Sequence, residues 1–327
     1  MNDVLALKAH KEPRAKSQEP RANVYVKILR LDHWIKQFFI LPGCICAYLL
    51  AKSETISILN FITGFLSVCL IASANYVINE YLDAEFDKYH PVKKSRPLVS
   101  RNVNAKIIWL MYALLTVSGL IAALGVNMPF FSVILWLWVM GILYNVKPFR
   151  TKDIPVLDVL SESLNNAIRL LAGWFIISGT TLPPVSLIAG YWTGGAFLMD
   201  VKRYAEYRMI GNPELAGKYR RSFMFYTERF LLVAAFFYAM CSVFFTGIFL
   251  IKYRVELVLF VPAMIGLFCY YFVLSFKNDS AVQKPEKLYH EKGLMFYCAV
   301  LIVLFAVLMS ADIPAMRVLA SSELIGL

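Results

Sequence analysis

The sequence has few charged residues for its length. Charged side chains make up 17% of its 327 residues, whereas soluble domains average about 25%. Hydrophobic residues make up 59% and aromatic residues 15%. This balance excludes an ordinary soluble domain and indicates an integral membrane protein.

Recognisable signatures of several other protein classes are also missing. The six cysteines all fall in apolar runs and have no paired spacing with histidine, so we infer neither disulfides nor a zinc site. Residues 1–23 lack the apolar core of a signal peptide. No RNA- or DNA-reading motif accompanies the net charge of +11, so we expect no nucleic-acid partner.

Long apolar runs dominate the remaining sequence. A bilayer span needs about 20 residues, and the sequence predicts about nine such helices in an all-α, polytopic membrane protein. The expected spans are 35–51, 56–78, 106–125, 128–145, 156–178, 183–199, 228–251, 255–276 and 294–311. The expected division of the chain is a flexible basic cytoplasmic arm at 1–30, a transmembrane catalytic domain at 31–312 and a short non-cytoplasmic tail at 313–327.

Lysine and arginine are distributed unevenly between the two sides of these spans. The amino-terminal arm and every second connection carry 26 of them, and the opposite side carries four. Because cytoplasmic loops are enriched in these residues, we expect the amino terminus inside the cell, the carboxyl terminus outside and the protein in the cell (inner) membrane.

The first charged cluster is "NEYLDAEFDKYHPVKKSRP" at residues 79–97. In a helix, Asn79, Asp83 and Asp87 fall at i, i+4 and i+8 with Glu80 beside them, whereas Glu85 points away. Stacked carboxylates repel one another unless a cation lies between them, and hard oxygen ligands favour Mg²⁺. These four residues are therefore the predicted metal ligands. The alternative is a solvated helix end whose acids pair with the lysines that follow.

A basic loop follows this acidic helix end. Lys93 and Arg96 lie between two prolines that prevent the helix from continuing. A rigid basic loop beside a metal site is suited to phosphate oxygens. Read alone, the same loop would only mark the cytoplasmic side.

Two further charged sets adjoin the same predicted side. The second consists of loop residues and a polar stripe on span 156–178. The loop residues are Tyr144, Lys147, Arg150, Lys152 and Asp153, and the stripe is formed by Asp158, Glu162, Asn165, Asn166 and Arg169. Charges within a span indicate a functional site, although an Asp158–Arg169 contact between helices is the structural alternative. In the third set, Glu206 can pair with Lys202 or Arg203.

The run Asn79-Glu-x-x-Asp83-x-x-x-Asp87 resembles the Asn-Asp-x-x-Asp-x-x-x-Asp motif of the UbiA superfamily of intramembrane prenyltransferases. The resemblance implies an all-helical bundle with a cytoplasm-facing central cavity, in which Mg²⁺ binds a diphosphate. Glu80 departs from the usual Asp.

The continuation His90-Pro-x-Lys93-x-x-Arg96-Pro is most similar to decaprenyl-phosphate phosphoribosyltransferases. That resemblance implies transfer of the 5-phosphoribosyl group of phosphoribosyl diphosphate to a polyprenyl phosphate, with release of pyrophosphate. It implies catalytic roles for Asp83, Asp87 and Asp158. The substrate-binding residues would be Lys93, Arg96, Tyr144, Lys152, Arg169, Lys202, Arg203 and Glu206.

Two other functions remain open at the level of sequence. A prenyltransferase acting on an aromatic or other small acceptor would use the same metal cluster, but the number of bases exceeds what one diphosphate requires. A transporter or lipid-binding protein would explain polar residues in mid-span, but it gives no reason for carboxylates at i, i+4 and i+8. The sequence gives no indication of the oligomeric state or the lipid length.

The predicted orientation can be checked by cysteine labelling in a cysteine-free background. We expect a cysteine in the 277–293 loop to be protected from an impermeant thiol reagent in intact cells, and one near residue 320 to be labelled, because of the uneven distribution of lysine and arginine. The reverse pattern would overturn the topology.

Overall fold

The structure is a computed structural model that describes residues 21–51, 57–100, 103–277, 280–283 and 285–316. Within these residues the chain is helical and contains no strand, which confirms the predicted fold class. The elements that make up the bundle are α1 (Arg21–Leu29), η1 (Leu31–Ile40), α2 (Leu41–Leu50), α3 (Ile58–Asp87), α5 (Ala105–Leu124), α6 (Met128–Asn145), α7 (Leu157–Ile177), α8 (Val185–Ile210), α10 (Glu228–Tyr253), η5 (Val255–Leu259), α11 (Phe260–Leu274) and α12 (Lys292–Ser310).

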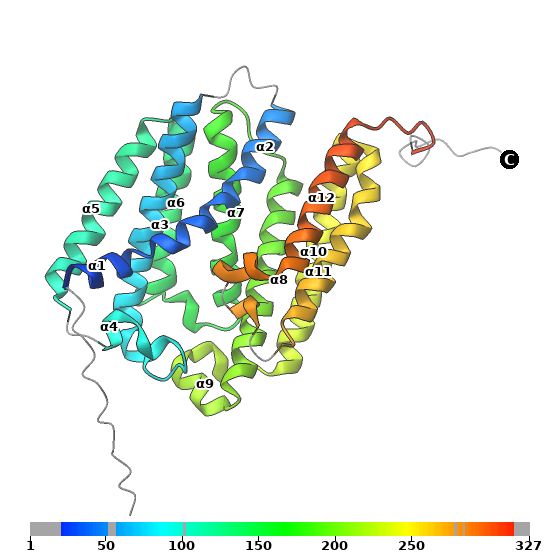
Figure 1. Cartoon of the computed structure of the whole chain (residues 1–327). Helices are drawn as coiled ribbons and strands as arrows, with labels where there is room; N and C mark the ends of the chain where they lie inside the picture. Colours follow the sequence, from blue (N-terminus) through cyan, green and yellow to red (C-terminus); the bar gives the residue numbers. More distant parts are fainter. Residues whose placement is uncertain (1–20, 52–56, 101–102, 278–279, 284, 317–327) are drawn as a thin grey trace, which may run out of the picture.

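Short helices fill the connections between these elements. They are η2 (Lys93–Ser95), α4 (Pro97–Ser100), η3 (Thr151–Asp153), α9 (Pro213–Tyr219), η4 (Arg221–Met224), η6 (Ala281–Gln283) and η7 (Pro285–His290). In Figure 1, α4 and α9 lie at the same end of the bundle. The charged loops predicted from the sequence are therefore gathered at one end.

Each expected span coincides with a long helix, but the helices differ in apolar character. Seven helical stretches in the described part of the chain are long and apolar enough to cross a bilayer: Val24–Leu50, Ile58–Asp87, Ala105–Leu124, Met128–Asn145, Glu228–Tyr253, Val255–Leu274 and Lys292–Ser310. The other two, α7 and α8, carry the second and third charged sets. The protein is a multi-pass membrane protein.

The polar helices α7 and α8 lie inside the bundle. Figure 1 shows α3, α5 and α6 on one side of them and α10, α11 and α12 on the other. Helix α7 contacts α2, α3, α6 and α8. Polar side chains on α7 and α8 can therefore face protein or a cavity instead of lipid.

Two glycines bring α7 against the first transmembrane segment. A Cβ on Gly43 would overlap the carbonyl oxygen of Leu170, and a Cβ on Gly173 would overlap that of Ile40. Only glycine permits this approach, as in other close helix contacts within membranes. The contact also places η1 along α7.

Part of the expected flexible arm is folded. Residues 1–20 lie outside the described residues, but Arg21–Leu29 forms helix α1. Its Val24 and Ile28 are buried against Val77 and Ile108, because this stretch has apolar side chains one turn apart. The folded part thus includes Arg21–Leu29. Of the predicted tail at 313–327, residues 317–327 lie outside the described residues.

The glycine contact gives a prediction about stability. Replacing Gly173 by alanine should lower the melting temperature in detergent, by a destabilisation of about 1–3 kcal/mol typical of overpacking, because the added methyl group meets backbone. Gly247→Ala in α10 is the matched control, since a Cβ there meets nothing within 4 Å. Equal melting temperatures for the two variants would refute the close contact.

Candidate active site

A cavity of about 490 Å³ lies between the polar helices and the loops. Its lining comes from η1, α3, α6, α7 and α8 and from the loops around residues 90–96 and 219–220. It receives side chains from all three charged sets that the sequence singled out. Tyr144, Lys93, Arg96, Arg169, Lys202 and Glu206 all line it.

The first cluster presents one face of α3 to this cavity. Asn79, Asp83 and Asp87 line it, as the helical spacing predicts, and Glu85 is exposed. Asn79 Nδ2 donates to Asp83 Oδ2 at 3.2 Å and to Asn145 Oδ1 at 2.6 Å. The amide is thereby fixed between α3 and the end of α6.

Each cavity-facing carboxylate of α3 is paired with bases from a loop. Asp83 Oδ1 lies 2.5 Å from Lys152 Nζ and 2.9 Å from Arg150 Nη2. Asp87 Oδ2 lies 2.5 Å from Arg96 Nη1. Burial lowers the pKa of the Lys152 ammonium to about 8, although Asp83 acts to raise it. Lysine and arginine side chains therefore lie directly beside both carboxylates.

Glu80 does not join the other three predicted metal ligands. It is 2% exposed, lies outside the cavity lining, and its Oε2 is 3.5 Å from Arg30 Nε. At about 100° per residue, the helix period places Glu80 within about 60° of both Asp83 and Asp87. The pairing with Arg30, which lies outside α3, therefore accounts for its place outside the cavity lining.

The donor set of the remaining residues fits Mg²⁺ in chemistry. Within the described ranges, no three His, Cys, Asp or Glu side chains are close enough to hold an ion by themselves. Two carboxylates and one amide nevertheless face the same cavity, and Mg²⁺ is commonly held by one or two carboxylates together with water and substrate phosphates. Asn79, Asp83 and Asp87 are the residues that could hold it.

Asp158 lies behind the cavity wall and does not line it. It is fully buried, and it accepts hydrogen bonds from Tyr226 Oη at 2.5 Å and Ser222 Oγ at 3.1 Å. It also lies 3.2 Å from Arg203 Nε and 3.6 Å from Arg220 Nη1. Partners far along the chain therefore enclose this carboxylate and separate it from the cavity, and its catalytic role stays a prediction.

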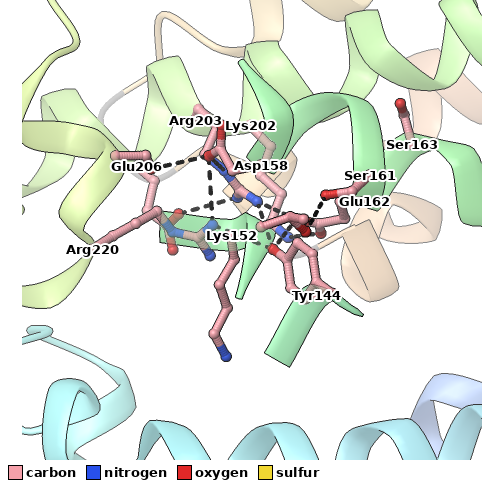
Figure 2. A network of polar contacts seen from close by, with 12 residues as sticks. Tyr144, Lys152, Asp158, Ser161, Glu162, Ser163, Lys202, Arg203, Glu206 and Arg220 are labelled. Carbon is pink, nitrogen blue, oxygen red and sulfur yellow. Dashed lines mark hydrogen bonds and ion pairs between the residues drawn. The ribbon is translucent and has the colours of Figure 1, made fainter. Parts of the chain in front are cut away.

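Glu162 connects the polar stripe of α7 to α8, as Figure 2 shows. It accepts from Tyr144 Oη at 2.8 Å and from Lys202 Nζ at 3.2 Å, and it also pairs with Arg203. Lys202 therefore pairs with Glu162, and of the two predicted partners of Glu206 it is Arg203 that lies beside it. Arg203 itself is fully buried and lies outside the cavity lining.

Glu206 joins the basic loop to the bundle. Its Oε1 lies 2.6 Å from Lys93 Nζ and 3.3 Å from His90 Nε2, and it accepts from Tyr219 Oη at 3.2 Å. Its Oε2 lies 3.5 Å from Arg203 Nη1, the predicted pairing within α8. Burial lowers the pKa of the Lys93 ammonium, against the raising effect of Glu206.

Arg169 does not pair with Asp158, so the structural alternative proposed for these two residues is not observed. Its guanidinium donates to Gln37 Oε1 of η1 at 2.8 Å, to the Asn165 carbonyl oxygen at 3.1 Å and to Asn166 Oδ1 at 3.4 Å. Among the described residues, Arg169 is the predicted base that has amide oxygens and no carboxylate as hydrogen-bond partners.

Two basic residues beside the cavity were given no site role from the sequence, although Arg150 belongs to the second charged set. Arg220 lines the cavity and donates to Tyr144 Oη at 3.3 Å, and Arg150 pairs with Asp83. Both occur in loops whose basic residues also mark the cytoplasmic side. Nothing in the sequence distinguished a base that contacts the site from one that only marks the cytoplasmic side.

The family of the chain can be stated with this geometry in hand. Residues 40–300 match the profile of the UbiA prenyltransferase family. The chain belongs to this family. The predicted family resemblance, and with it the prediction of a membrane-embedded transferase, is confirmed at the level of the family.

Three similar curated proteins are a pair of phosphoribosyltransferases and one prenyltransferase. Decaprenyl-phosphate phosphoribosyltransferase of Corynebacterium glutamicum is 27% identical over 67% of this chain and 65% of its own length. The enzyme of the same name from Mycolicibacterium smegmatis is 26% identical over 70% of each chain. A 4-hydroxybenzoate octaprenyltransferase of Vibrio cholerae is 31% identical over 53% of this chain and 61% of its own length. The match to the Corynebacterium relative spans slightly less than two thirds of that relative.

Solved structures share the fold. A UbiA homolog from Archaeoglobus fulgidus bound to GPP and Mg²⁺ superposes with a TM-score of 0.66 at 20% identity, covering 85% of this chain and 99% of the homolog. A homolog from Aeropyrum pernix superposes with a TM-score of 0.59 at 15% identity, covering 83% and 98%. Both likenesses show that this chain has the fold of these homologs.

The cavity-facing carboxylates give a matched mutational prediction. Asp83→Asn or Asp87→Asn should abolish turnover in a folded protein, because each change removes a charged ligand from the cavity. Glu85→Gln, on the exposed face, should leave activity within a few-fold of wild type. The measurement is the rate of pyrophosphate release by purified variants with matched melting temperatures. Equal losses at all three positions would contradict the assignment of the face.

Proposed function

We propose that this protein is a Mg²⁺-dependent transferase that moves the 5-phosphoribosyl group of phosphoribosyl diphosphate to a polyprenyl phosphate and releases pyrophosphate. The observation that carries the proposal is the excess of bases around one carboxylate face. Asp83 and Asp87 share the site with Lys93, Arg96, Lys152, Arg169, Lys202 and Arg220. A single diphosphate does not require so many cations, whereas two substrates with three phosphate-bearing groups do.

The diphosphate of the donor is assigned to the α3 side of the cavity. Asn79, Asp83 and Asp87 would hold Mg²⁺, which supplies neutralising charge for the leaving pyrophosphate. Arg96 and Lys152 already lie 2.5 Å from the carboxylates. They are therefore placed to contact diphosphate oxygens, with Arg96 able to do so in bidentate fashion.

Lys93, Tyr144 and Lys202 form the roof of the cavity, and they would donate hydrogen bonds to phosphoribosyl diphosphate. Glu206 orients Lys93, while Glu162 orients Tyr144 and Lys202. These contacts hold the side chains in one geometry before substrate binds, which is the condition for efficient positioning. Asp158 and Arg203 support the same roof from behind.

The chemistry requires no general base on the acceptor. The bond between C1 of the ribose and the diphosphate oxygen breaks, and an oxygen of the lipid phosphate forms the new bond to C1. A phosphate monoester has a second pKa near 6, so this oxygen is already anionic at neutral pH. The protein has to bring two anions together, and positively charged side chains serve that purpose.

The membrane orientation suits these substrates. We assign the protein to the inner membrane with the amino terminus in the cytoplasm. Phosphoribosyl diphosphate is water-soluble, and the charged loops at the α4 and α9 end of the bundle would face it (Figure 1). The lipid acceptor would remain in the bilayer.

Prenyl transfer to an aromatic or other small acceptor is the second candidate. It is favoured by the relative named 4-hydroxybenzoate octaprenyltransferase, and it would use the same Asp83 and Asp87 face. It gives no role to the additional bases. A transporter or lipid-binding protein without chemistry fits family membership least, and Mg²⁺-dependent pyrophosphate release would exclude it.

The two enzyme functions are separated by a product assay. With Mg²⁺, purified protein should convert phosphoribosyl diphosphate and a polyprenyl monophosphate into lipid-linked ribose 5-phosphate. Polyprenyl diphosphate and 4-hydroxybenzoate should give no product. Lys93→Ala should lower kcat/KM by roughly an order of magnitude or more, since a hydrogen bond to a charged group contributes about 1.5–3 kcal/mol.

Lys94→Ala is the control within the same loop, because Lys94 is exposed and should be replaceable without loss. Incorporation of a labelled prenyl chain into 4-hydroxybenzoate, with no ribosyl transfer under the same conditions, would sink the proposal and promote the second candidate.

A further inference from the structure

Arg169 differs from the other bases of the site in what holds it. In the part of the chain that the structure describes, its guanidinium contacts only the amide groups of Gln37, Asn165 and Asn166. No carboxylate in the described part of the chain lies within 4.0 Å of the Arg169 guanidinium. Lys93, Arg96 and Lys202 each have a carboxylate partner within 3.2 Å.

An arginine without a counter-charge within a membrane helix is energetically unfavourable. Charged groups at such depth normally pair with one another or mark the path of a substrate or ion. Arg169 lines the cavity together with Asn165 and Asn166, and the buried Oδ1 of Asn165 has no hydrogen-bond partner among the described residues. Both observations indicate that a ligand completes this polar group.

The position of Arg169 separates it from the α3 cluster. It lies seven residues beyond Glu162 on α7, which is about 10 Å along the helix axis and away from the loops. Its partner Gln37 belongs to η1. Lys36 of η1 also lines the cavity, with Nζ 3.3 Å from His33 Nδ1.

This end of the cavity reaches the apolar outside of the bundle. Phe39 lines the cavity and is 43% exposed. Its neighbours Ile35 and Phe38 are exposed as well, on a segment apolar enough to contact lipid. A ligand with a long apolar tail can thus place its head beside Arg169 and its tail past Phe39.

We propose that Arg169 and Lys36 form the head-group site for the phosphate monoester of the lipid acceptor, apart from the bases that bind the donor. This assignment rests on the proposed function. The planar guanidinium matches two phosphate oxygens at once. Gln37 and Asn166 fix its orientation without neutralising its charge. The α3 carboxylates and their metal remain for the diphosphate.

The test varies each substrate in turn with the full-length purified protein. Arg169→Gln should raise the KM for a polyprenyl monophosphate by on the order of tenfold to a hundredfold and leave the KM for phosphoribosyl diphosphate within about twofold. Lys93→Gln is the matched control and should affect the donor KM instead. Arg169→Lys keeps the charge but loses the fork, so its acceptor KM should lie between those of wild type and Arg169→Gln.

A binding measurement without donor separates this site from the reaction. Wild-type protein in detergent should be stabilised against heat by a polyprenyl monophosphate more than by the corresponding polyprenol, and Arg169→Gln should lose that preference. If no ribosyl transfer occurs but the preference depends on Arg169, the function is wrong and the head-group site stands. If transfer occurs and the acceptor KM of Arg169→Gln is unchanged, the site is wrong and the function stands.

Two further outcomes also decide the matter. A rise in the donor KM of Arg169→Gln, with an unchanged acceptor KM, would assign Arg169 to the 5-phosphate of the donor and overturn the proposal. If Arg169→Gln does not fold, Gln37→Leu provides the test, because it removes an orienting contact and keeps the charge. That variant should raise the acceptor KM only.

Discussion

Pairing of charges inside an apolar bundle is the constraint on which the rest of this structure depends. Asp83, Asp158, Glu162 and Glu206 come from three helices, and each is matched by lysine or arginine side chains. An unpaired charge at such a position would be costly. The same pairs fasten the loops after α3 and α8 to the helices, because Lys93 pairs with Glu206 and Arg220 pairs with Asp158. The ion pairs that hold the loops over the helices thus also supply the charged lining of the cavity.

Much of this architecture could be predicted from the sequence. Apolar runs of sufficient length gave the positions of the helices, since backbone hydrogen bonding leaves few alternatives in a bilayer. The periodicity of α3 placed Asp83 and Asp87 on the face that lines the cavity and Glu85 on the exposed face. It could do so because all three residues belong to one continuous helix. The polar stripe of α7 likewise marked residues that line the cavity, including Arg169.

The errors concern residues whose environment is set by distant parts of the chain. Asp158 looks like a cavity residue by spacing, but Ser222 and Tyr226 enclose it, and no local pattern reveals a contact across more than 60 positions. Glu80 pairs with Arg30, which lies between α1 and η1, and it stays outside the cavity lining. Arg220 was hidden among basic residues that also serve the topology.

The backbone contact between α2 and α7 has a consequence for how the two ends of the cavity respond to ligands. Ion pairs are exchangeable, since a phosphate can replace a carboxylate as the partner of Lys93 or Arg96 with little change in the number of contacts. Backbone packed against Gly43 and Gly173 has no such substitute. The loop end of the cavity is thus held by ion pairs that a bound anion can replace, whereas the wall formed by η1 and α7 is held by packed backbone.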